Sequence, residues 1–470
     1  MLQRHVPFIQ NDWPGMKETM HANSTAARWV VLAIVSVVMM MGYVVAKEMS
    51  PLQYFLELPA SQGGLGWNSA EYGLFVGSRG FFNVFLLMLF VSGLVLDKFG
   101  VRIAGTLSCM LMLVGTGIDY WAVAFASPLP VSTVTFPPLG LDHAVIKDQV
   151  LWAAFGFAVF GIGYELCGIT VSKVIVKWFS GKEMALAMGI QVALARLGTA
   201  LALGGGPVLA KHFSLSTPIV VGLVSVLVGF VAYLFYCMID RKSDLQESAA
   251  SADDRFHFRD LVVTIKSPGF WLITLLCMLY YSALYPFLDF ATKLMVSKYG
   301  VDPELAGWIS SILPFTSIVL TPLFGSMYDH IGRGASIMII GTIMLTLVLA
   351  VFALPFDSSA LAVLLMLILG IAFSLLPSVL WPAVPKIVPQ KQLGTAYSII
   401  YYIQNIGLML VPILIGNVLR AHTTADGVTD YTSAMWIFTG IGIAGIIVAA
   451  MLLFADRKWP YGLEHSNIEN

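Results

Sequence analysis

The chain has 470 residues; 58% of them are hydrophobic, only 11% are charged, and the net charge is −1. An ordinary soluble domain carries about 25% charged residues. This composition therefore excludes a disordered chain, a nucleic-acid-binding protein and a soluble multidomain enzyme. The cysteines are scattered without metal-ligand spacing, and we expect no metal and no cofactor. The sequence predicts a protein that crosses a membrane many times.

Apolar stretches long enough to cross a bilayer recur along the whole chain. A membrane helix needs about 20 apolar residues, and about twelve stretches satisfy that length by the same criterion. We expect spans at 27–47, 69–96, 102–126, 150–176, 183–210, 216–239, 269–297, 304–328, 335–355, 359–384, 392–419 and 430–455.

A polar, charged segment separates the first six spans from the last six. The predicted fold is an all-α membrane protein with two six-helix bundles. Within the segment, HFRDLVVTIK is predicted to form a short helix on the membrane surface. We expect an N-terminal tail (1–26), an N-terminal bundle (27–240), a linker (241–268), a C-terminal bundle (269–456) and a C-terminal tail (457–470).

Basic residues are concentrated in one set of loops, which places those loops and both termini on the cytoplasmic side. That set holds Lys98, Arg102, Lys177, Lys182, the linker, Arg333, Lys386, Lys391, Arg457 and Lys458. The opposite loops are expected to hold only Lys47, Lys147, Lys211, Lys298 and Arg420.

One motif occurs at the same place in each half, after spans two and eight. Its pattern is Gly-x3-Asp-x2-Gly followed by a basic residue. The first glycine permits close helix packing, the Asp can pair with a base or a helix N-terminus, and the second glycine permits a tight turn. We interpret the motif as a cytoplasmic latch; the alternative is a simple turn with topogenic charges. Its residues are Gly93, Asp97, Gly100 and Arg102, then Gly325, Asp329, Gly332 and Arg333.

Two ionisable residues lie near the predicted membrane midplane. Glu165 in span four and Arg196 in span five are each roughly 16–20 Å from the cytoplasmic face at 1.5 Å per residue. Such residues are costly in a membrane and usually functional. They form either a structural pair between the two spans or a clamp for a zwitterion. In the clamp, Glu165 binds an ammonium and Arg196 a carboxylate. Glycines recur in both spans and permit tight packing.

Other charged residues within spans allow more than one interpretation. Arg79 lines the cavity or pairs with Glu48 or Asp289 at an outer gate. Lys173 is expected to reach the cytoplasmic face along its apolar stem. Asp119 and Asp289 lie near outer helix ends and are expected to be solvated.

In the second half, aromatic and amide side chains are the candidates for contact with a ligand. Aromatic rings with polar tips suit a cavity that holds a peptide-sized solute. Buried amides need a partner, either another helix or a ligand. An indole before a proline near the inner end of span ten is expected to form a gate or hinge. These residues are Tyr280, Tyr281, Tyr285, Gln404, Asn405 and Trp381.

The twelve spans, the central linker and the paired motif resemble the major facilitator superfamily, which implies two bundles that rock about a midplane site. Several stretches are similar to the lysosomal dipeptide transporters of animals: FGIGYE, GIQVALARLG, Leu380-Trp381-Pro382 and Ile-Gln404-Asn405-Ile-Gly407. This resemblance implies facilitated diffusion of dipeptides, with Glu165 and Arg196 holding the dipeptide termini. Arg79 and Lys173 depart from that family, where these positions look uncharged.

We therefore expect a non-enzymatic uniporter for dipeptides or similar zwitterions that works by alternating access. Its partners would be a small-molecule substrate and the lipid bilayer, without nucleic acid. It would be a monomer in a bacterial inner membrane; the sequence carries no signal for or against an accessory subunit. The alternatives are an organic-anion or sugar-acid carrier, with or without proton coupling, and a receptor or scaffold that does not transport. No nucleotide-binding loop, Ser/His/Asp set or metal cluster occurs in the spans.

Overall fold

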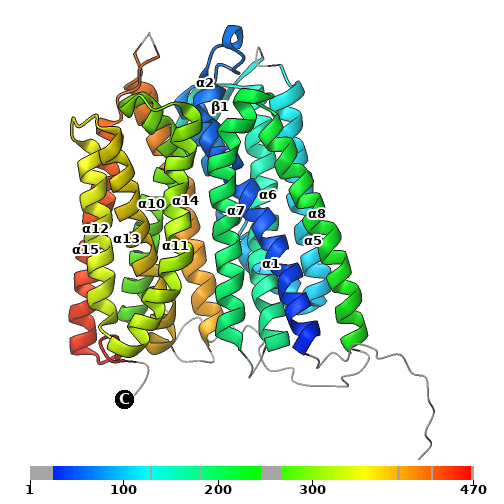
Figure 1. Ribbon diagram of the computed structural model, residues 1–470, viewed down its shortest axis with the longest axis vertical. Helices are drawn as coiled ribbons and strands as arrows, with labels where there is room; N and C mark the ends of the chain where they lie inside the picture. The colour runs from blue at the N-terminus through cyan, green and yellow to red at the C-terminus, as the bar shows by residue number, and fades with distance from the viewer. Residues whose placement is uncertain are drawn as a thin grey trace, which may run out of the picture.

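The computed structural model describes residues 25–127, 130–179, 183–244, 266–388, 392–424 and 427–466. It is built almost wholly from helices (Figure 1). The first part holds α1 (Thr25–Glu48), η1 (Ser50–Leu52), α2 (Gln53–Glu57), η2 (Ala60–Gln62), α3 (Ser69–Ser78), α4 (Phe81–Phe85), α5 (Met88–Phe125), β1 (Val131–Phe136), η3 (Pro137–Leu139), β2 (Leu141–Lys147), α6 (Asp148–Phe179), α7 (Met184–His212) and α8 (Thr217–Asp244). The second part holds α10 (Pro268–Tyr299), α11 (Pro303–Ile331), α12 (Gly334–Ala353), α13 (Ser359–Ile387), α14 (Leu393–Ala421) and α15 (Thr432–Lys458).

Among the described residues, eleven helices are long and apolar enough to cross a membrane. The difference from the expected twelve arises at the second span (69–96), which is not one helix. It comprises α3, then α4, then the start of α5, with the breaks at Arg79-Gly80 and at Leu86-Leu87. Leu87 adopts a left-handed conformation with φ of 53°. Helix α5 then continues through a kink at Gly100 into the third expected span.

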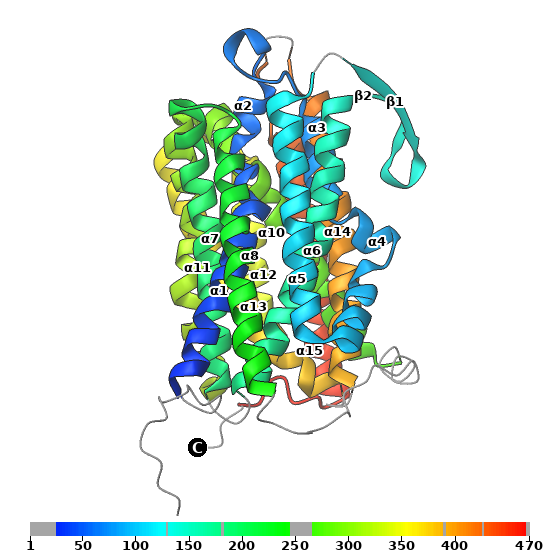
Figure 2. The ribbon, with the colours of Figure 1, turned by 90° about the vertical axis from the view of Figure 1, so that its right-hand side faces the viewer.

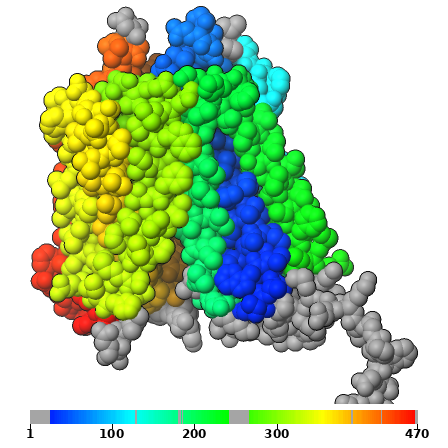
Figure 3. Space-filling view, in the orientation of Figure 1, coloured from blue at the N-terminus to red at the C-terminus, as the bar shows by residue number. Residues whose placement is uncertain are grey.

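The helices form the two expected bundles, α1–α8 and α10–α15, and a hydrophobic core runs through both. The two most extensive contacts between the bundles are those of α7 with α11 and of α3 with α14. In the space-filling view, α7 and α11 are in contact along the upper part of the visible face (Figure 3). The bundles are therefore joined by helix seams, and the polar contacts described below add to them.

A two-stranded antiparallel hairpin of β1 and β2 marks one end of the molecule (Figure 2). Its Phe136 ring contacts the rings of Phe81 and Phe85 of α4, at 5.8 and 5.3 Å between centroids. We call this end the hairpin end. The opposite end, where Asp97 and Asp329 lie, is the motif end.

Glycines bring helix backbones together, as expected for spans four and five. A methyl group added at Gly156 or Gly163 of α6 would collide with the backbone of α5, and one at Gly198 of α7 would collide with α1. The contact between α3 and α14 is of the same kind, because Gly73 and Gly416 pack directly against each other. These contacts confirm that small residues set the helix spacing here.

Most of the expected linker (241–268) lies outside the described residues, as does most of its predicted surface helix. The part that is described shows α8 extending to Asp244 and α10 beginning at Pro268. The division of the chain at this linker stays a prediction.

Candidate functional site

Glu165 lies in the middle of α6 and faces residues from both bundles. Its carboxylate interacts with the guanidinium of Arg79 and with the side-chain amide of Asn405 from α14. Arg79 lies at the break that follows α3, with its guanidinium 5.4 Å from the ring centre of Tyr164. Its carbonyl packs against Gly161 of α6, where any side chain would collide with it. The broken second span thus places a cation beside Glu165.

Arg196 lies in the middle of α7 and contacts the C-terminal bundle. Its Nη1 donates a hydrogen bond of 2.7 Å to the hydroxyl of Tyr285 in α10. The guanidinium also lies 4.2 Å from the ring centre of Phe373 in α13. A guanidinium stacked on a ring keeps its outer N–H groups available for a carboxylate. No carboxylate forms an ion pair with Arg196 in the part of the chain that the structure describes.

Glu165 and Arg196 are not paired with each other. Among the described ion pairs of 4.0 Å or less, none involves either residue, and Tyr43 of α1 interacts with both. The structure therefore does not show the direct pair between spans four and five. Both side chains, and that of Arg79, are only partly buried. Partly exposed charges at the middle of membrane helices indicate a polar space between the bundles.

Aromatic side chains of α10, α13 and α14 form the opposite wall of this region. The rings of Tyr281 and Tyr285 are stacked with centroids 5.5 Å apart. Trp381 donates a hydrogen bond of 3.2 Å to the hydroxyl of Tyr281 and stacks on Tyr401. Gln404 accepts a hydrogen bond from the thiol of Cys277, at 3.7 Å.

Tyr280 differs from its aromatic neighbours and from the sequence expectation. Its hydroxyl donates a hydrogen bond of 2.6 Å to the carbonyl of Ala372, and the residue is 1% exposed. Consecutive residues on a helix point about 100° apart. When Tyr281 faces the site, Tyr280 therefore faces the interior of its own bundle. We assign Tyr280 to packing in this arrangement.

A buried ion pair closes the space toward the hairpin end. Lys47 of α1 pairs with Asp289 of α10, which also accepts a hydrogen bond from Ser50. The backbone carbonyl of Asp289 accepts a hydrogen bond of 2.9 Å from Tyr72 of α3. The expectation that Asp289 is solvated is therefore wrong: it is 6% exposed because it joins the two bundles.

Lys47 and Asp119 also differ from expectation. Lys47 was expected in an outer loop, but it is 4% exposed in the last turn of α1. Asp119 was expected to be solvated, but it is 1% exposed inside the N-terminal bundle, and its Oδ1 accepts no hydrogen bond. Lys47 lies deeper than a count of apolar residues suggested, because the helical segment continues past the predicted span to Glu57. Asp119 lies inside its predicted span, and a count of apolar residues does not show that its side chain faces the interior of the bundle.

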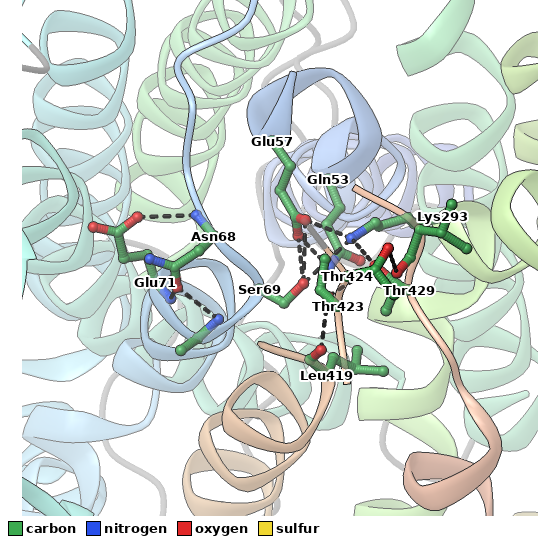
Figure 4. A network of polar contacts seen from close by, with 12 residues as sticks. Gln53, Glu57, Asn68, Ser69, Glu71, Lys293, Leu419, Thr423, Thr424 and Thr429 are labelled. Carbon is green, nitrogen blue, oxygen red and sulfur yellow. Dashed lines mark hydrogen bonds and ion pairs between the residues drawn. The ribbon is translucent and has the colours of Figure 1, made fainter. Parts of the chain in front are cut away.

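A second network joins the bundles further toward the hairpin end (Figure 4). Lys293 of α10 pairs with Glu57 of α2, and its Nζ also donates hydrogen bonds to Ser69 at 3.2 Å and Thr429 at 3.3 Å. Glu57 accepts further hydrogen bonds from Gln53 and Ser69. The side chains of Lys293 and Glu57 are only 6% and 13% exposed. The four contacting segments come from both bundles, so this network holds the hairpin end closed.

At the motif end, the ion pairs that the structure describes lie within the N-terminal bundle. Lys173 of α6 pairs with Asp97 at 2.7 Å, and Arg102 approaches Asp240 of α8 at 3.8 Å. Lys173 is partly exposed, as its expected reach to the membrane face requires. Asp97 does not bridge the bundles in this arrangement.

The motif glycines divide into two kinds. Gly100 and Gly332 have φ of 75° and 70°, the conformation that a tight turn requires. Gly93 and Gly325 have open space where a side chain would point, so the expected close packing is absent there. Arg333 follows the second turn, and its N–H donates to the carbonyl of Glu464 in the C-terminal tail at 3.1 Å. The latch role of Asp97 and Asp329 stays a prediction.

Sequence reasoning missed several residues that the structure brings to this region. Tyr43 and Tyr164 carry polar tips at mid-span, which is the signal that marked Tyr281. For Lys47 and Lys293, the only signal in the sequence was a charge near the end of a predicted span. Phe373 carries no polar atom, so nothing in the sequence separates it from the other apolar residues of its helix.

Comparison with known proteins places this geometry in a family. The sequence model of the Major Facilitator Superfamily matches residues 22–294 and 285–466. The chain is 29% identical over 322 residues to the lysosomal dipeptide transporter MFSD1 of Homo sapiens, covering 65% of this chain and 66% of that protein. It is 28% identical over 352 residues to the Danio rerio protein of the same name, covering 71% and 69%.

A crystal structure of a mutant of the nucleoside transporter NupG superposes with a TM-score of 0.67 at 16% identity. The match covers 90% of this chain and 99% of that one. At this identity the likeness concerns the fold alone. The family model spans both bundles and the fold agrees with it, so the chain is a multi-pass membrane protein that belongs to the Major Facilitator Superfamily.

Proposed function

We propose that this protein transports dipeptides or similar small zwitterions by alternating access, as a uniporter. The observation that carries the proposal is the separation of opposite charges at mid-depth. Glu165 interacts with Asn405 of the other bundle, and Arg196 donates a hydrogen bond to Tyr285 there. A ligand with an ammonium and a carboxylate would engage both charges, and with them both bundles. The similarity to proteins named lysosomal dipeptide transporters supports the same reading.

Ligand binding would couple to bundle movement because the site spans the seam between the bundles. Cross-bundle ion pairs of the described residues lie at the hairpin end, as with Lys47–Asp289 and Lys293–Glu57. This arrangement is closed at the hairpin end. Opening it would require those pairs to break, while Asp97 and Asp329 would latch the motif end. A midplane site with rocking bundles is the general plan of this fold.

Uniport is supported by the partners of the carboxylates nearest the site. Glu165 has Arg79 and Asn405, and Asp289 has Lys47 and Ser50. In this arrangement each of the two carboxylates already has a cation and a hydrogen-bond donor as partners. Histidines of the described segments lie in the β-hairpin, in loops or at helix ends, such as His143, His212 and His330. Among the described residues, the site thus contains no histidine that could carry a proton.

We place the motif end in the cytoplasm of a bacterial inner membrane, with a monomer as the functional unit. Basic residues such as Arg102, Lys177 and Arg457 support that orientation. Division at the 241–268 linker would leave two halves that move as bodies.

The test is uptake of radiolabelled dialanine into proteoliposomes. Glu165→Gln and Arg196→Gln are each expected to reduce uptake by at least a hundredfold, and N-acetyl-dialanine should fail to compete. Asp142→Asn and Arg420→Gln, both at exposed positions, serve as matched controls and should transport normally. Normal uptake by either site variant would refute the clamp.

An organic-anion carrier is the second candidate, because cations outnumber carboxylates around the site. Lys47, Arg79 and Arg196 are cationic, whereas Glu165 and Asp289 are the opposing carboxylates. Such a carrier would keep anion uptake in Glu165→Gln and lose it in Arg196→Gln. A zwitterion carrier would lose transport in both.

A further inference from the structure

The charges around the site do not balance. Lys47 interacts with Asp289 and also with the two other cations, Arg79 and Arg196. Arg79 interacts with both carboxylates, Glu165 and Asp289. The set therefore carries three positive charges and two negative ones, and the unbalanced charge is that of Arg196, whose contacts are hydroxyls and aromatic rings.

A neutral dipeptide would not remove this excess. Its carboxylate would neutralise Arg196, but its ammonium would bring a new positive charge to Glu165. Arg79 already faces that carboxylate, so Glu165 would then serve two cations. In a region of low dielectric the repulsion between the ligand ammonium and Arg79 is poorly screened. A ligand with one additional negative charge would bring the total to zero.

Two of the three cations, Lys47 and Arg79, also lie at a recess where a ligand side chain could extend. Lys47, Ser50, Arg79 and Asp289 line this recess together with Phe75 and Phe157. It is narrow in the present arrangement, which is closed at the hairpin end. Arg79 forms no ion pair within 4.0 Å among the described residues. Its five donors therefore remain available for a carboxylate.

We propose that Arg79 makes this protein select dipeptides with an acidic side chain over neutral dipeptides of the same shape. This inference rests on the proposed dipeptide function. The ligand ammonium lies at Glu165, its terminal carboxylate at Arg196, and its side-chain carboxylate at Arg79 on the border of the recess. Arg79 then acts as a specificity-determining residue that contacts the substrate.

The test is competition against radiolabelled dialanine uptake in proteoliposomes, with isosteric pairs as competitors. Glutamyl-alanine is compared with glutaminyl-alanine, and alanyl-glutamate with alanyl-glutamine. In the wild-type protein at least one acidic competitor is expected to inhibit at a concentration tenfold lower than its amide isostere. Equal inhibition within both pairs would overturn the inference. In Arg79→Gln the preference should fall to less than threefold, and an unchanged preference would overturn the assignment to Arg79.

A second variant keeps the test valid if Arg79→Gln does not fold. In Arg79→His the charge at position 79 can be changed by pH alone, since an ordinary histidine, with a pKa of about 6.5, is protonated at pH 5.5 and neutral at pH 8. The ligand carboxylates are ionised at both pH 5.5 and pH 8. The acidic preference should be absent at pH 8, and a tenfold preference there would contradict the role of Arg79.

The outcomes separate this inference from the proposed function. If dialanine is not transported and no dipeptide competes, the dipeptide function itself fails. If dialanine uptake depends on Glu165 and Arg196 but acidic competitors inhibit no better than their amide isosteres, only the inferred side-chain preference fails.

Discussion

Glu57→Gln is expected to open the hairpin end. The change removes the charge that pairs with Lys293 at a position where both side chains are almost fully buried. Lys293 keeps the hydroxyls of Ser69 and Thr429, which lie at 3.2 and 3.3 Å but carry no charge. Removing one partner of a buried ion pair costs about 3–5 kcal/mol. We take about 3 kcal/mol, because those hydroxyls remain.

That cost falls mainly on the closed arrangement, because opening the hairpin end would expose Lys293 to water. A free-energy change of about 2.7 kcal/mol moves a 99:1 equilibrium to roughly equal populations. The open population should therefore rise from about one per cent to about half. If less than one per cent of the wild-type protein is open, the same free-energy change applies, and the open population of the variant is correspondingly smaller.

The assay measures distances between spin labels at two exposed positions of the hairpin end. Phe213→Cys, just beyond α7, and Ser359→Cys, at the start of α13, report on different bundles in a background without the native cysteines. The wild-type protein should give one short distance, and Glu57→Gln should add a longer one.

Glu71→Gln is the matched control. Glu71 pairs with Lys147 at 2.9 Å near the same end, but both residues belong to the N-terminal bundle. It should leave the distances unchanged. The double change of Glu57 and Lys293 to glutamine should restore part of the closed population, since losing both charges is far less costly than losing one. An unchanged distribution in Glu57→Gln, or an equal shift in the control, would refute the reasoning.

Three further predictions concern single positions. Arg196→Lys removes the planar guanidinium that stacks on Phe373 and that could bind the ligand carboxylate through two N–H groups. Dialanine uptake should therefore fall at least thirtyfold. Uptake within threefold of wild type would contradict this role of Arg196. Tyr280→Phe removes the buried hydrogen bond to Ala372 and should lower the free energy of unfolding by about 1 kcal/mol while KM stays unchanged; a raised KM would return Tyr280 to the site. Asp119→Asn should leave the melting temperature within 2 °C at pH 7, because the buried Oδ1 of Asp119 accepts no hydrogen bond that the change would remove. A large fall in the melting temperature would show that the charge of Asp119 stabilises the fold.

The sequence was sufficient for every span except the second, because length and hydropathy control membrane insertion. Charges at mid-span are rare, and this rarity is what singled out Glu165 and Arg196 as predicted site residues. Their partners could not be derived in the same way. Lys47 and Asp289 are 242 residues apart in the chain, and a charge near a span end looks like a loop charge until its partner is known.

The break in the second span had no clear signal either. Gly80 alone does not end a helix, and Leu86-Leu87 favours one. The break is held by tertiary contacts: Asn83 donates a hydrogen bond to the carbonyl of Gly161 at 3.3 Å, and the Arg79 carbonyl packs on the same glycine. Such contacts exist only after α6 is in place, so local propensity could not reveal them.

The broken second span has a mechanical consequence. An unbroken helix from one membrane face to the other would act as a lever, and any displacement of its hairpin-end half would be imposed on its motif-end half. Here α3 packs against α14, whereas α5 packs against α6. If the bundles move as proposed, the break between α3 and α5 would let the hairpin-end half follow the opposite bundle while the motif-end half stays with its own. The change of angle would then be taken up at Arg79, beside the proposed ligand site, before it reaches the turn at Gly100.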